Sequence, residues 1–261
     1  MALRQRGLAK NVVGVGRRQA SLDKAINCGA ISQATLDIEA AVQQAELVVV
    51  CTPVASVAED VCRALQASEA IVTDVGSTKA TICHEIEAEA EADDASRFVG
   101  SHPLAGDHRT GPENARADLF EGKTVVMTLT ASTVKETTAG IQEFWESLGA
   151  QVVQMTPAEH DQALASTSHL PHLVASVLAA VTPEPWLPLA ATGWSDTTRV
   201  AAGDPELWTQ IFAQNLPELL STLDRLIDEF GQMRALLANE DWQKTQDYLA
   251  RAKRIRDALG N

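Results

Sequence analysis

The chain has 261 residues, 45% of them hydrophobic, and a formal net charge of −14. This length and apolar content are enough for one or two domains with a buried core. The negative charge argues against a surface for nucleic acid or for an anionic membrane, and an anionic substrate would need a local cluster of arginine or histidine.

The four cysteines, Cys28, Cys51, Cys62 and Cys83, lack the spacing of a metal site, so we expect free thiols and no bound metal. No run of about 18 consecutive apolar residues occurs. The N-terminus also lacks the apolar core of a signal peptide. These features predict a cytoplasmic protein that does not associate with membranes.

Strand and helix patterns alternate through the first half of the chain. After a helix end over 2–6 with Gly7 as its cap, strands are predicted at 11–15, 47–53, 71–74, 98–101, 123–129 and 152–155, and helices at 19–28, 36–45, 57–67, 79–91 and 132–148. Unbroken apolar runs such as LVVV at 47–50 are typical of strands buried on both faces. The order predicts an α/β fold with a doubly wound parallel sheet over 1–155.

After Pro157 no strand pattern returns, and apolar spacings of three and four residues predict an all-helical second domain over 156–261. One apolar stripe extends over more than two heptads and contains Pro217, which could kink it. The stripe could be intramolecular core or the seam of a dimer. Its residues are Phe212, Leu216, Leu219, Leu223, Leu226 and Phe230.

Two glycines near the N-terminus, Gly14 and Gly16, match only part of a dinucleotide-binding G-x-G-x-x-G pattern, because position 19 is Gln19. In the other interpretation, residues 12–16 are the second strand of a dinucleotide fold. Arg17 and Arg18 then stand where an arginine accepts the 2′-phosphate of NADP, although arginines that open a helix are often merely solvated.

Two polar side chains follow two predicted strands, Ser77 after 71–74 and His102 at the end of 98–101. Ligands of open α/β sheets bind at the carboxyl ends of the strands, so we expect both side chains in one crevice. Pro103 keeps His102 out of helical geometry. The pair could be a nucleophile with its base, or a general base with a group that positions a substrate hydroxyl.

The second half contains two further polar groups. His169 and His172 are three residues apart; such a pair could bind zinc, but no third ligand is suggested nearby, which favours a hydrogen-bonded or substrate-contacting role. Arg199 stands among small and apolar residues. It could form a salt bridge with Asp196 or Asp204, or bind a substrate carboxylate through its guanidinium group.

Taken in order, four segments resemble the prephenate/arogenate dehydrogenases of tyrosine biosynthesis: DVGSTK at 74–79, SHPLAG at 101–106, SHLPH at 168–172 and DTTR at 196–199. The resemblance covers essentially the whole chain. It implies a Rossmann-type domain followed by an all-helical dimerisation domain. It also implies an enzyme that oxidatively decarboxylates prephenate or arogenate with NADP or NAD, and that forms a homodimer.

By position, the resemblance makes His102 the catalytic histidine, which takes the proton of the ring hydroxyl, and Ser77 the serine that holds that hydroxyl and the histidine. A serine nucleophile is disfavoured, because Ser77 lacks the G-x-S-x-G elbow. The residues that match the binding of a substrate carboxylate are Arg199 and, around it, His169, His172 and Asp196.

One departure concerns the cofactor. Members of the family open with a strand and a Gly-rich turn before the helix that here begins at Met1, so we expect a late start site or a fragment lacking about 20 residues. The cofactor residues that remain recognisable are Thr52, Pro53, Arg17 and Arg18.

Three alternatives stay open. The residues do not separate prephenate from arogenate as substrate. A different β-hydroxyacid-type dehydrogenase could share the two-domain plan, and it would be indifferent to loss of Arg199. A truncated paralogue or helical dimerisation module without cofactor would not be an enzyme at all.

Overall fold

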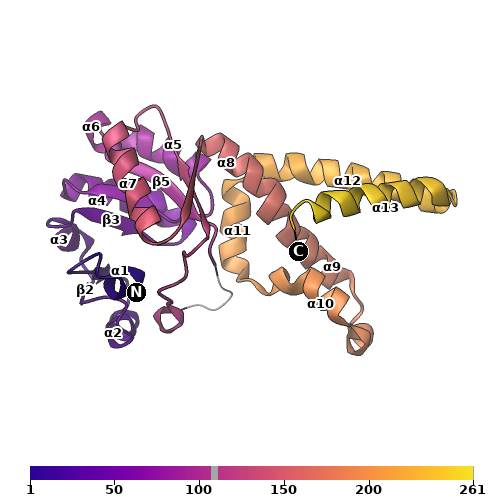
Figure 1. The fold of residues 1–261 in the computed structure, drawn as a ribbon, viewed down its shortest axis with the longest axis horizontal. Helices are drawn as coiled ribbons and strands as arrows, with labels where there is room; N and C mark the ends of the chain where they lie inside the picture. Colours follow the sequence, from indigo (N-terminus) through magenta and orange to yellow (C-terminus); the bar gives the residue numbers. More distant parts are fainter. Residues whose placement is uncertain (107–110, 261) are drawn as a thin grey trace. The chain divides into compact units, whose positions relative to one another are not determined.

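The computed structural model describes residues 1–106 and 111–260, and the chain packs as two compact units, Met1–Leu216 and Pro217–Asn261. The first unit contains all the described strands, which form two sheets (Figure 1). Their bounds are β1 (Val13–Val15), β2 (Gln33–Thr35), β3 (Leu47–Val50), β4 (Ile71–Asp74), β5 (Phe98–Pro103), β6 (Thr124–Thr128) and β7 (Gln151–Met155).

The larger sheet has the order β3-β4-β5-β6-β7, and β1 pairs in parallel with β2 in a separate sheet. Strands β3, β4 and β5 run parallel, as predicted, whereas β6 is antiparallel to β5. The prediction of a wholly parallel sheet is therefore wrong at this pair. A parallel connection needs a crossover, usually a helix, but in its described part the β5–β6 connection contains only the 3₁₀ turn η2 (Pro112–Asn114).

The helices of this half lie close to their predicted positions. They are α1 (Ala2–Gln5), α2 (Gln19–Asn27), α3 (Ile38–Val42), α4 (Val57–Ala67), α5 (Ala80–Glu89), α6 (Ala92–Ala95) and α7 (Lys135–Ser147). Gly7 has φ +67, the left-handed conformation expected of a residue that ends a helix. The sequence patterns missed β2 and α6, each of which has only three or four residues.

Two hydrophobic cores cover the two faces of the larger sheet. On one face, Val61 of α4 and Ile82 of α5 pack in one cluster with Val72 of β4. On the other face, Trp145 of α7 packs in a cluster with Val99 of β5. Burial on both faces explains the unbroken apolar runs and confirms the doubly wound α/β fold.

The rest of the first unit is helical in its described residues, as predicted for 156–216. It comprises α8 (Pro157–Leu164), the π-helical stretch η3 (Ala165–His169), α9 (Leu170–Val181), the 3₁₀ turn η4 (Glu184–Leu189), α10 (Thr192–Thr198), the turn η5 (Arg199–Ala202) and α11 (Pro205–Gln214). The stretch Pro157–Val181 is the one described helix that is long and apolar enough to cross a bilayer. Of its apolar 18-residue segment, 28% is buried within the protein. Its residues His160, Asp161 and His169 make hydrogen bonds inside the first unit.

The second unit is a pair of helices, α12 (Leu216–Ala238) and α13 (Trp242–Asp257). Glu240, with φ 55, lies in the turn between them, and Arg251 pairs with Glu229 across the two helices at 3.1 Å. The predicted apolar stripe is not one helix, because α11 ends at Gln214 before α12 begins. Pro217 stands in the first turn of α12, where backbone N–H groups have no acceptor within the helix. The missing N–H of proline therefore breaks no hydrogen bond there, and Pro217 marks a helix start instead of a kink.

Candidate active site

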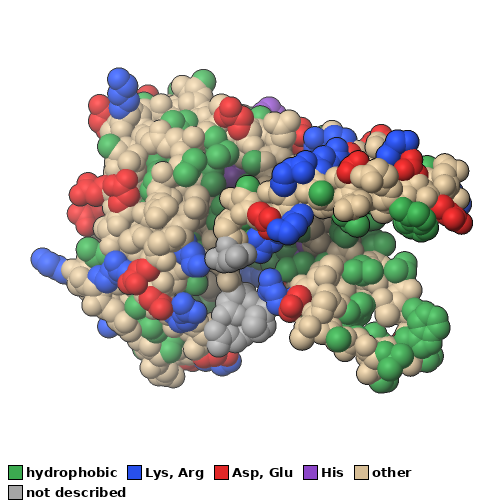
Figure 2. Space-filling view, turned by 45° about the vertical axis from the view of Figure 1, so that its right-hand side comes forward, with side chains coloured by type: hydrophobic (Ala, Val, Ile, Leu, Met, Phe, Trp, Pro, Cys, Tyr) green, Lys and Arg blue, Asp and Glu red, His purple; other side chains and the backbone are tan. Residues whose placement is uncertain are grey.

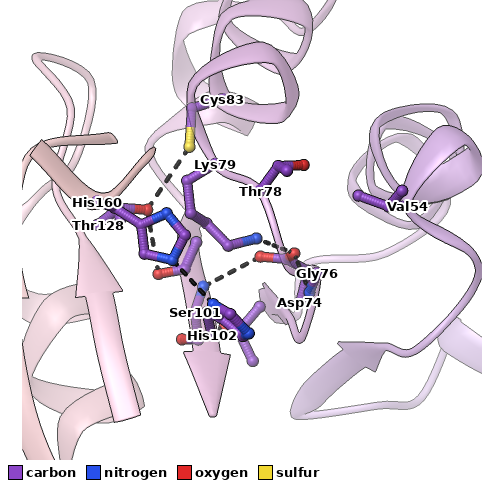
Figure 3. Close-up of polar contacts among 12 residues, drawn as sticks. Val54, Asp74, Gly76, Thr78, Lys79, Cys83, Ser101, His102, Thr128 and His160 are labelled. Carbon is purple, nitrogen blue, oxygen red and sulfur yellow. Dashed lines mark hydrogen bonds and ion pairs between the residues drawn. The ribbon is translucent and has the colours of Figure 1, made fainter. Parts of the chain in front are cut away.

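The carboxyl ends of β4 and β5 meet in a buried network around Asp74 (Figure 3). One carboxylate oxygen of Asp74 accepts a hydrogen bond from the backbone N–H of Ser101 at 3.0 Å, and the other accepts one from Gly76 N–H at 2.8 Å and pairs with the Lys79 ammonium. Asp74 and Lys79 are fully buried. The ion pair therefore ties the turn that carries Ser77 to the strand end that carries His102.

Glycine is required at position 76, inside this turn. A Cβ atom there would lie 2.8 Å from the Asp74 carboxylate and 2.9 Å from Ile82, closer than such atoms approach in proteins. The tight turn lets the backbone pass the ion pair and present Ser77 at the pocket.

Helix α8 supplies the partner of the candidate base. The Nδ1 atom of His102 lies 2.9 Å from Nε2 of His160, and Nδ1 of His160 lies 2.7 Å from a carboxylate oxygen of Asp161. His160 is fully buried and Asp161 is 2% exposed. The three side chains form a linear hydrogen-bonded chain that ends on His102.

The Asp161 carboxylate also caps helix α5 from outside that helix. Its two oxygens accept hydrogen bonds from the backbone N–H groups of Lys79 at 2.8 Å and Ala80 at 2.9 Å. Free N–H groups at a helix N-terminus interact favourably with a negatively charged side chain, so this position suits an aspartate. Asn215 donates to the Asp161 backbone carbonyl at 2.8 Å and lies 3.1 Å from Nδ1 of His169.

Ser77 and His102 line one pocket of about 540 Å³, together with residues of the segment after β5 and of α8 and η3. The predicted crevice at the strand ends is therefore present. Burial, followed by the neighbouring His160 and Lys79, lowers the pKa of His102 well below its ordinary value of 6.5. An imidazole with such a pKa is neutral at pH 7 and can accept a proton.

The two histidines of α9 and η3 pack around Trp208 of α11. The His172 ring stacks on Trp208 with centroids 3.6 Å apart, and the His169 ring meets it edge-on at 6.3 Å. Burial lowers the pKa of His169 to about 4. Nδ1 of His172 is buried and makes no hydrogen bond within the described residues, so it can accept or donate one to a ligand.

Arg199 and Asp196 do not line the pocket and are exposed at η5 and α10. Within residues 1–106 and 111–260, Arg199 forms no ion pair with Asp196 or Asp204, the two partners considered for a salt bridge. Asp204 instead caps α11 by accepting from Glu206 N–H at 2.8 Å. The guanidinium group of Arg199 is thus available for an anion.

The four predicted cofactor residues are exposed at strand ends. Arg17 and Arg18 follow β1, and Thr52 and Pro53 follow β3. Neither arginine forms an ion pair in the described part of the chain. Exposed cations and a hydroxyl at the carboxyl ends of parallel strands suit a dinucleotide with phosphate groups, so these residues fit a nicotinamide cofactor.

Sequence reasoning gave no role to His160, Asp161, Asp74 or Lys79. The sequence does contain a signal that places His160 and Asp161 in the first half of a helix. Thr156 and Glu159 form a capping box, which fixes the start of α8 just before these two residues. The Asp74–Lys79 pair lies within the quoted DVGSTK segment. No spacing rule indicates that a strand-end aspartate and a lysine five residues later are both fully buried.

Comparison with known proteins supplies the family. Residues 1–154 match the profile of the prephenate dehydrogenase nucleotide-binding domain, and residues 156–251 match that of the prephenate dehydrogenase dimerization domain. The chain belongs to the prephenate dehydrogenase family. The resemblance seen in the four sequence segments is thereby confirmed.

Characterised relatives extend over most of the chain. A cyclohexadienyl dehydrogenase of Zymomonas mobilis is 34% identical over 90% of this chain and 82% of its own length. A prephenate dehydrogenase of Bacillus subtilis is 30% identical over 99% of this chain and 72% of its own length.

Solved structures agree with this family assignment. A prephenate dehydrogenase of Aquifex aeolicus, in complex with hydroxyphenyl propionate and NAD+, has a TM-score of 0.90 at 28% identity, covering 99% of this chain and 92% of that one. A Synechocystis arogenate dehydrogenase has a TM-score of 0.83 at 31% identity, covering 99% of this chain and 94% of that one.

Proposed function

We propose that this member of the prephenate dehydrogenase family converts prephenate to 4-hydroxyphenylpyruvate by oxidative decarboxylation, with hydride transfer to NAD or NADP. The observation that carries the proposal is the pocket at the ends of β4 and β5. It holds Ser77 together with His102, whose pKa is lowered by burial. Loss of carbon dioxide and formation of an aromatic ring drive the reaction. The protein therefore needs chiefly a neutral base, an oriented substrate and cations for a dianion.

In this mechanism His102 takes the proton of the ring hydroxyl at Nε2, since its Nδ1 is occupied by His160. Ser77, which follows the neighbouring strand β4 and lines the same pocket, holds the hydroxyl in line with that nitrogen. Arg199 binds a substrate carboxylate, with His169, His172 and Asp196 as the surrounding network. Nδ1 of His172, which is buried and makes no hydrogen bond within the described residues, gives that network a group that a ligand could engage.

A bound nicotinamide cofactor would supply the acceptor for the hydride that leaves the carbon carrying the hydroxyl. Thr52 and Pro53 would hold it at the end of β3, and Arg17 and Arg18 would hold its adenosine end beyond β1. The two exposed arginines favour NADP, because its 2′-phosphate is an additional anion at that position.

Arogenate is the second candidate substrate. The high similarity to the Synechocystis arogenate dehydrogenase favours it, as does the cyclohexadienyl dehydrogenase among the relatives. Arogenate and prephenate differ by an amino group in place of a keto group on the side chain. The same base, serine and hydride acceptor serve both substrates.

The division into a cofactor domain over 1–155 and a helical substrate and dimerisation domain over 156–261 is supported by the boundaries of the two family profiles. A homodimer formed through the helical part agrees with its surface. Figure 2 shows hydrophobic side chains gathered over α9, η4 and α10, where Val177, Val181, Trp186 and Leu189 are at least half exposed. The charge and composition support a cytoplasmic enzyme that does not bind nucleic acid or membranes.

The test is turnover of prephenate and of arogenate with NAD and with NADP, followed by the absorbance of the reduced nicotinamide. His102→Asn should lower kcat by roughly 10²- to 10⁴-fold while leaving cofactor affinity unchanged, because only the base is removed. Arg199→Ala should raise KM for either substrate. Turnover by His102→Asn at the normal rate would overturn the assignment of the base.

Two other outcomes point to the remaining alternatives. Turnover of a small hydroxy acid, unaffected by Arg199→Ala, would indicate a β-hydroxyacid-type dehydrogenase. A folded protein whose melting temperature neither nicotinamide cofactor raises would indicate a non-enzyme paralogue.

A further inference from the structure

The geometry points to His160 and Asp161 as positioning residues that select the tautomer of His102 in which Nε2 carries a free lone pair. The inference rests on the proposed role of His102 as base. It concerns His160, which contacts Nδ1 of His102, and Asp161, which contacts His160 on its other side.

The first step is fixed by Asp161. A carboxylate only accepts hydrogen bonds, so the 2.7 Å contact requires a proton on Nδ1 of His160. The carboxylate is also held in place, because its two oxygens accept hydrogen bonds from the backbone N–H groups of Lys79 and Ala80. It therefore cannot turn away from Nδ1 of His160. Asp161 therefore determines which nitrogen of His160 is a donor.

The second step passes this choice to His102. A neutral imidazole protonated at Nδ1 is an acceptor at Nε2, so the 2.9 Å contact requires Nδ1 of His102 to donate. Nε2 of His102 is then unprotonated. It makes no hydrogen bond within the described residues, and the side chain lines the pocket that also carries Ser77. The base is thus presented to a substrate hydroxyl in its only useful form.

The chain of hydrogen bonds has one alternative, in which His160 carries protons on both nitrogens. His160 would then donate to His102, and the proton of His102 would move to Nε2, where it blocks base catalysis. The titratable groups around the two rings are Asp161 of α8, Lys79 at the start of α5 with its partner Asp74 of β4, and His169 of η3. The two alternatives place the proton of His102 on different nitrogens, so they can be told apart directly.

The experiment is ¹⁵N NMR of histidine-labelled protein, since the chemical shifts of Nδ1 and Nε2 identify the tautomer. The chain has six histidines, and the His102→Asn variant assigns the signals of His102. The expected result for the unchanged protein is protonated Nδ1 and unprotonated Nε2. Protonated Nε2 on a neutral His102 would overturn the inference.

Asp161→Asn is the variant that should reverse the chain. An amide that keeps its oxygen on the N–H of Ala80 offers its own N–H to Nδ1 of His160, with loss of the bond from Lys79 N–H. The proton of each imidazole then shifts to the other nitrogen. We expect protonated Nε2 on His102 and a fall in kcat of roughly 10²- to 10⁴-fold, with KM little changed. In the serine-protease triad, replacing the aspartate by asparagine leaves the histidine in the wrong tautomer and lowers kcat by about 10⁴-fold.

His160→Gln should restore much of the function by a different route. The glutamine oxygen can accept the Nδ1 proton of His102, so we expect the unchanged tautomer and a kcat within about tenfold of the parent. His160→Leu, which offers no acceptor, should lose the tautomer preference and lower kcat further than His160→Gln. Equal losses in the two variants would contradict a positioning role and indicate simple packing.

Asp37→Asn is the matched control, because Asp37 caps α3 by accepting from Ala40 N–H and touches no imidazole. It should change neither the tautomer of His102 nor kcat. The readouts also separate the two proposals. If the parent protein turns over neither prephenate nor arogenate, the proposed function fails, whereas the tautomer measured in the parent and in Asp161→Asn still decides the inference.

Discussion

The strand ends of the first unit fall into two groups that differ in how much of their geometry the protein itself sets. At the ends of β4 and β5, Asp74 and Lys79 are fully buried, and every described contact of the Asp74 carboxylate is to a donor of the same network. At the ends of β1 and β3, Arg17, Arg18 and Thr52 are exposed, and the arginines form no ion pair in the described residues.

The ends of β4 and β5 therefore form a preorganised site, whereas the side chains at the ends of β1 and β3 would become ordered only when a ligand binds. Buried hydrogen bonds hold His102, the proposed base, and the turn that carries Ser77 before any substrate binds, which reduces the reorganisation that the proposed reaction needs. Exposed side chains at the cofactor end lose their freedom only when a ligand orders them. Substitutions at the first group should therefore change stability and rate, and substitutions at the second group should change affinity alone.

The largest effect is expected from breaking the buried ion pair. Lys79→Met leaves the Asp74 carboxylate in the interior without its cation, and removing one partner of a buried pair costs about 3–5 kcal/mol. The free energy of unfolding, measured with urea, should fall by this amount. The turn that carries Ser77 should also loosen, so kcat should fall in the protein that remains folded.

Lys24→Met is the matched substitution at an exposed pair. Lys24 lies 3.3 Å from Glu113, and both side chains are more than half exposed. Water screens such a pair, so we expect an almost unchanged unfolding midpoint. A similar loss in both variants would show that the ion pair of Asp74 is no more important than a surface pair.

The second effect is a pH dependence of stability that arises in the same buried network. The pKa of His169 is lowered to about 4 by burial, whereas an unfolded histidine titrates near 6.5. Above pH 6.5 the residue is neutral in both states. As the pH falls from 6.5 to 4, the unfolded state binds the proton first, and stability decreases by on the order of 3 kcal/mol.

Urea unfolding at a series of pH values measures the slope of the unfolding free energy against pH. His102, whose pKa is also lowered by burial, contributes to this slope in the same direction. His169→Gln should flatten it, and His84→Gln on the exposed side of α5 should not. An identical slope in the parent and in His169→Gln would contradict the assignment to His169. The absolute stability of the variants does not enter, because only the slope is compared.

The elements of the fold followed from the sequence because their signals are local. Apolar runs located β3 and β4, and apolar periodicity located α4 within its observed bounds. The antiparallel β5–β6 pair did not follow, because strand direction depends on the connection and not on the strand's own residues. The division of the apolar stripe at Asn215 was missed because spacing alone does not reveal a helix end.

The site divides in the same manner. Ser77 and His102 were recognisable because each stands near the carboxyl end of a strand, and the ends of neighbouring parallel strands lie at one edge of the sheet. His160 is 58 residues from His102, and Asp161 is 82 and 81 residues from Lys79 and Ala80, so no local pattern joins them to His102 or to the start of α5. Buried polar contacts between distant segments are set by packing, which requires the three-dimensional structure.

The smallest effect is expected at the exposed cofactor end. Replacing Arg17 and Arg18 together with alanine removes two cations that face the predicted 2′-phosphate, and exposed charge pairs contribute about 0.2–1 kcal/mol each. The Kd for NADP, measured by quenching of tryptophan fluorescence, should rise by roughly tenfold. The Kd for NAD and the unfolding midpoint should not change, since neither depends on an interaction with those side chains. An equal loss for NAD and NADP would place the arginines on a part that both cofactors share. A change in the midpoint would mean that the end of β1, like the ends of β4 and β5, is already ordered by contacts within the protein.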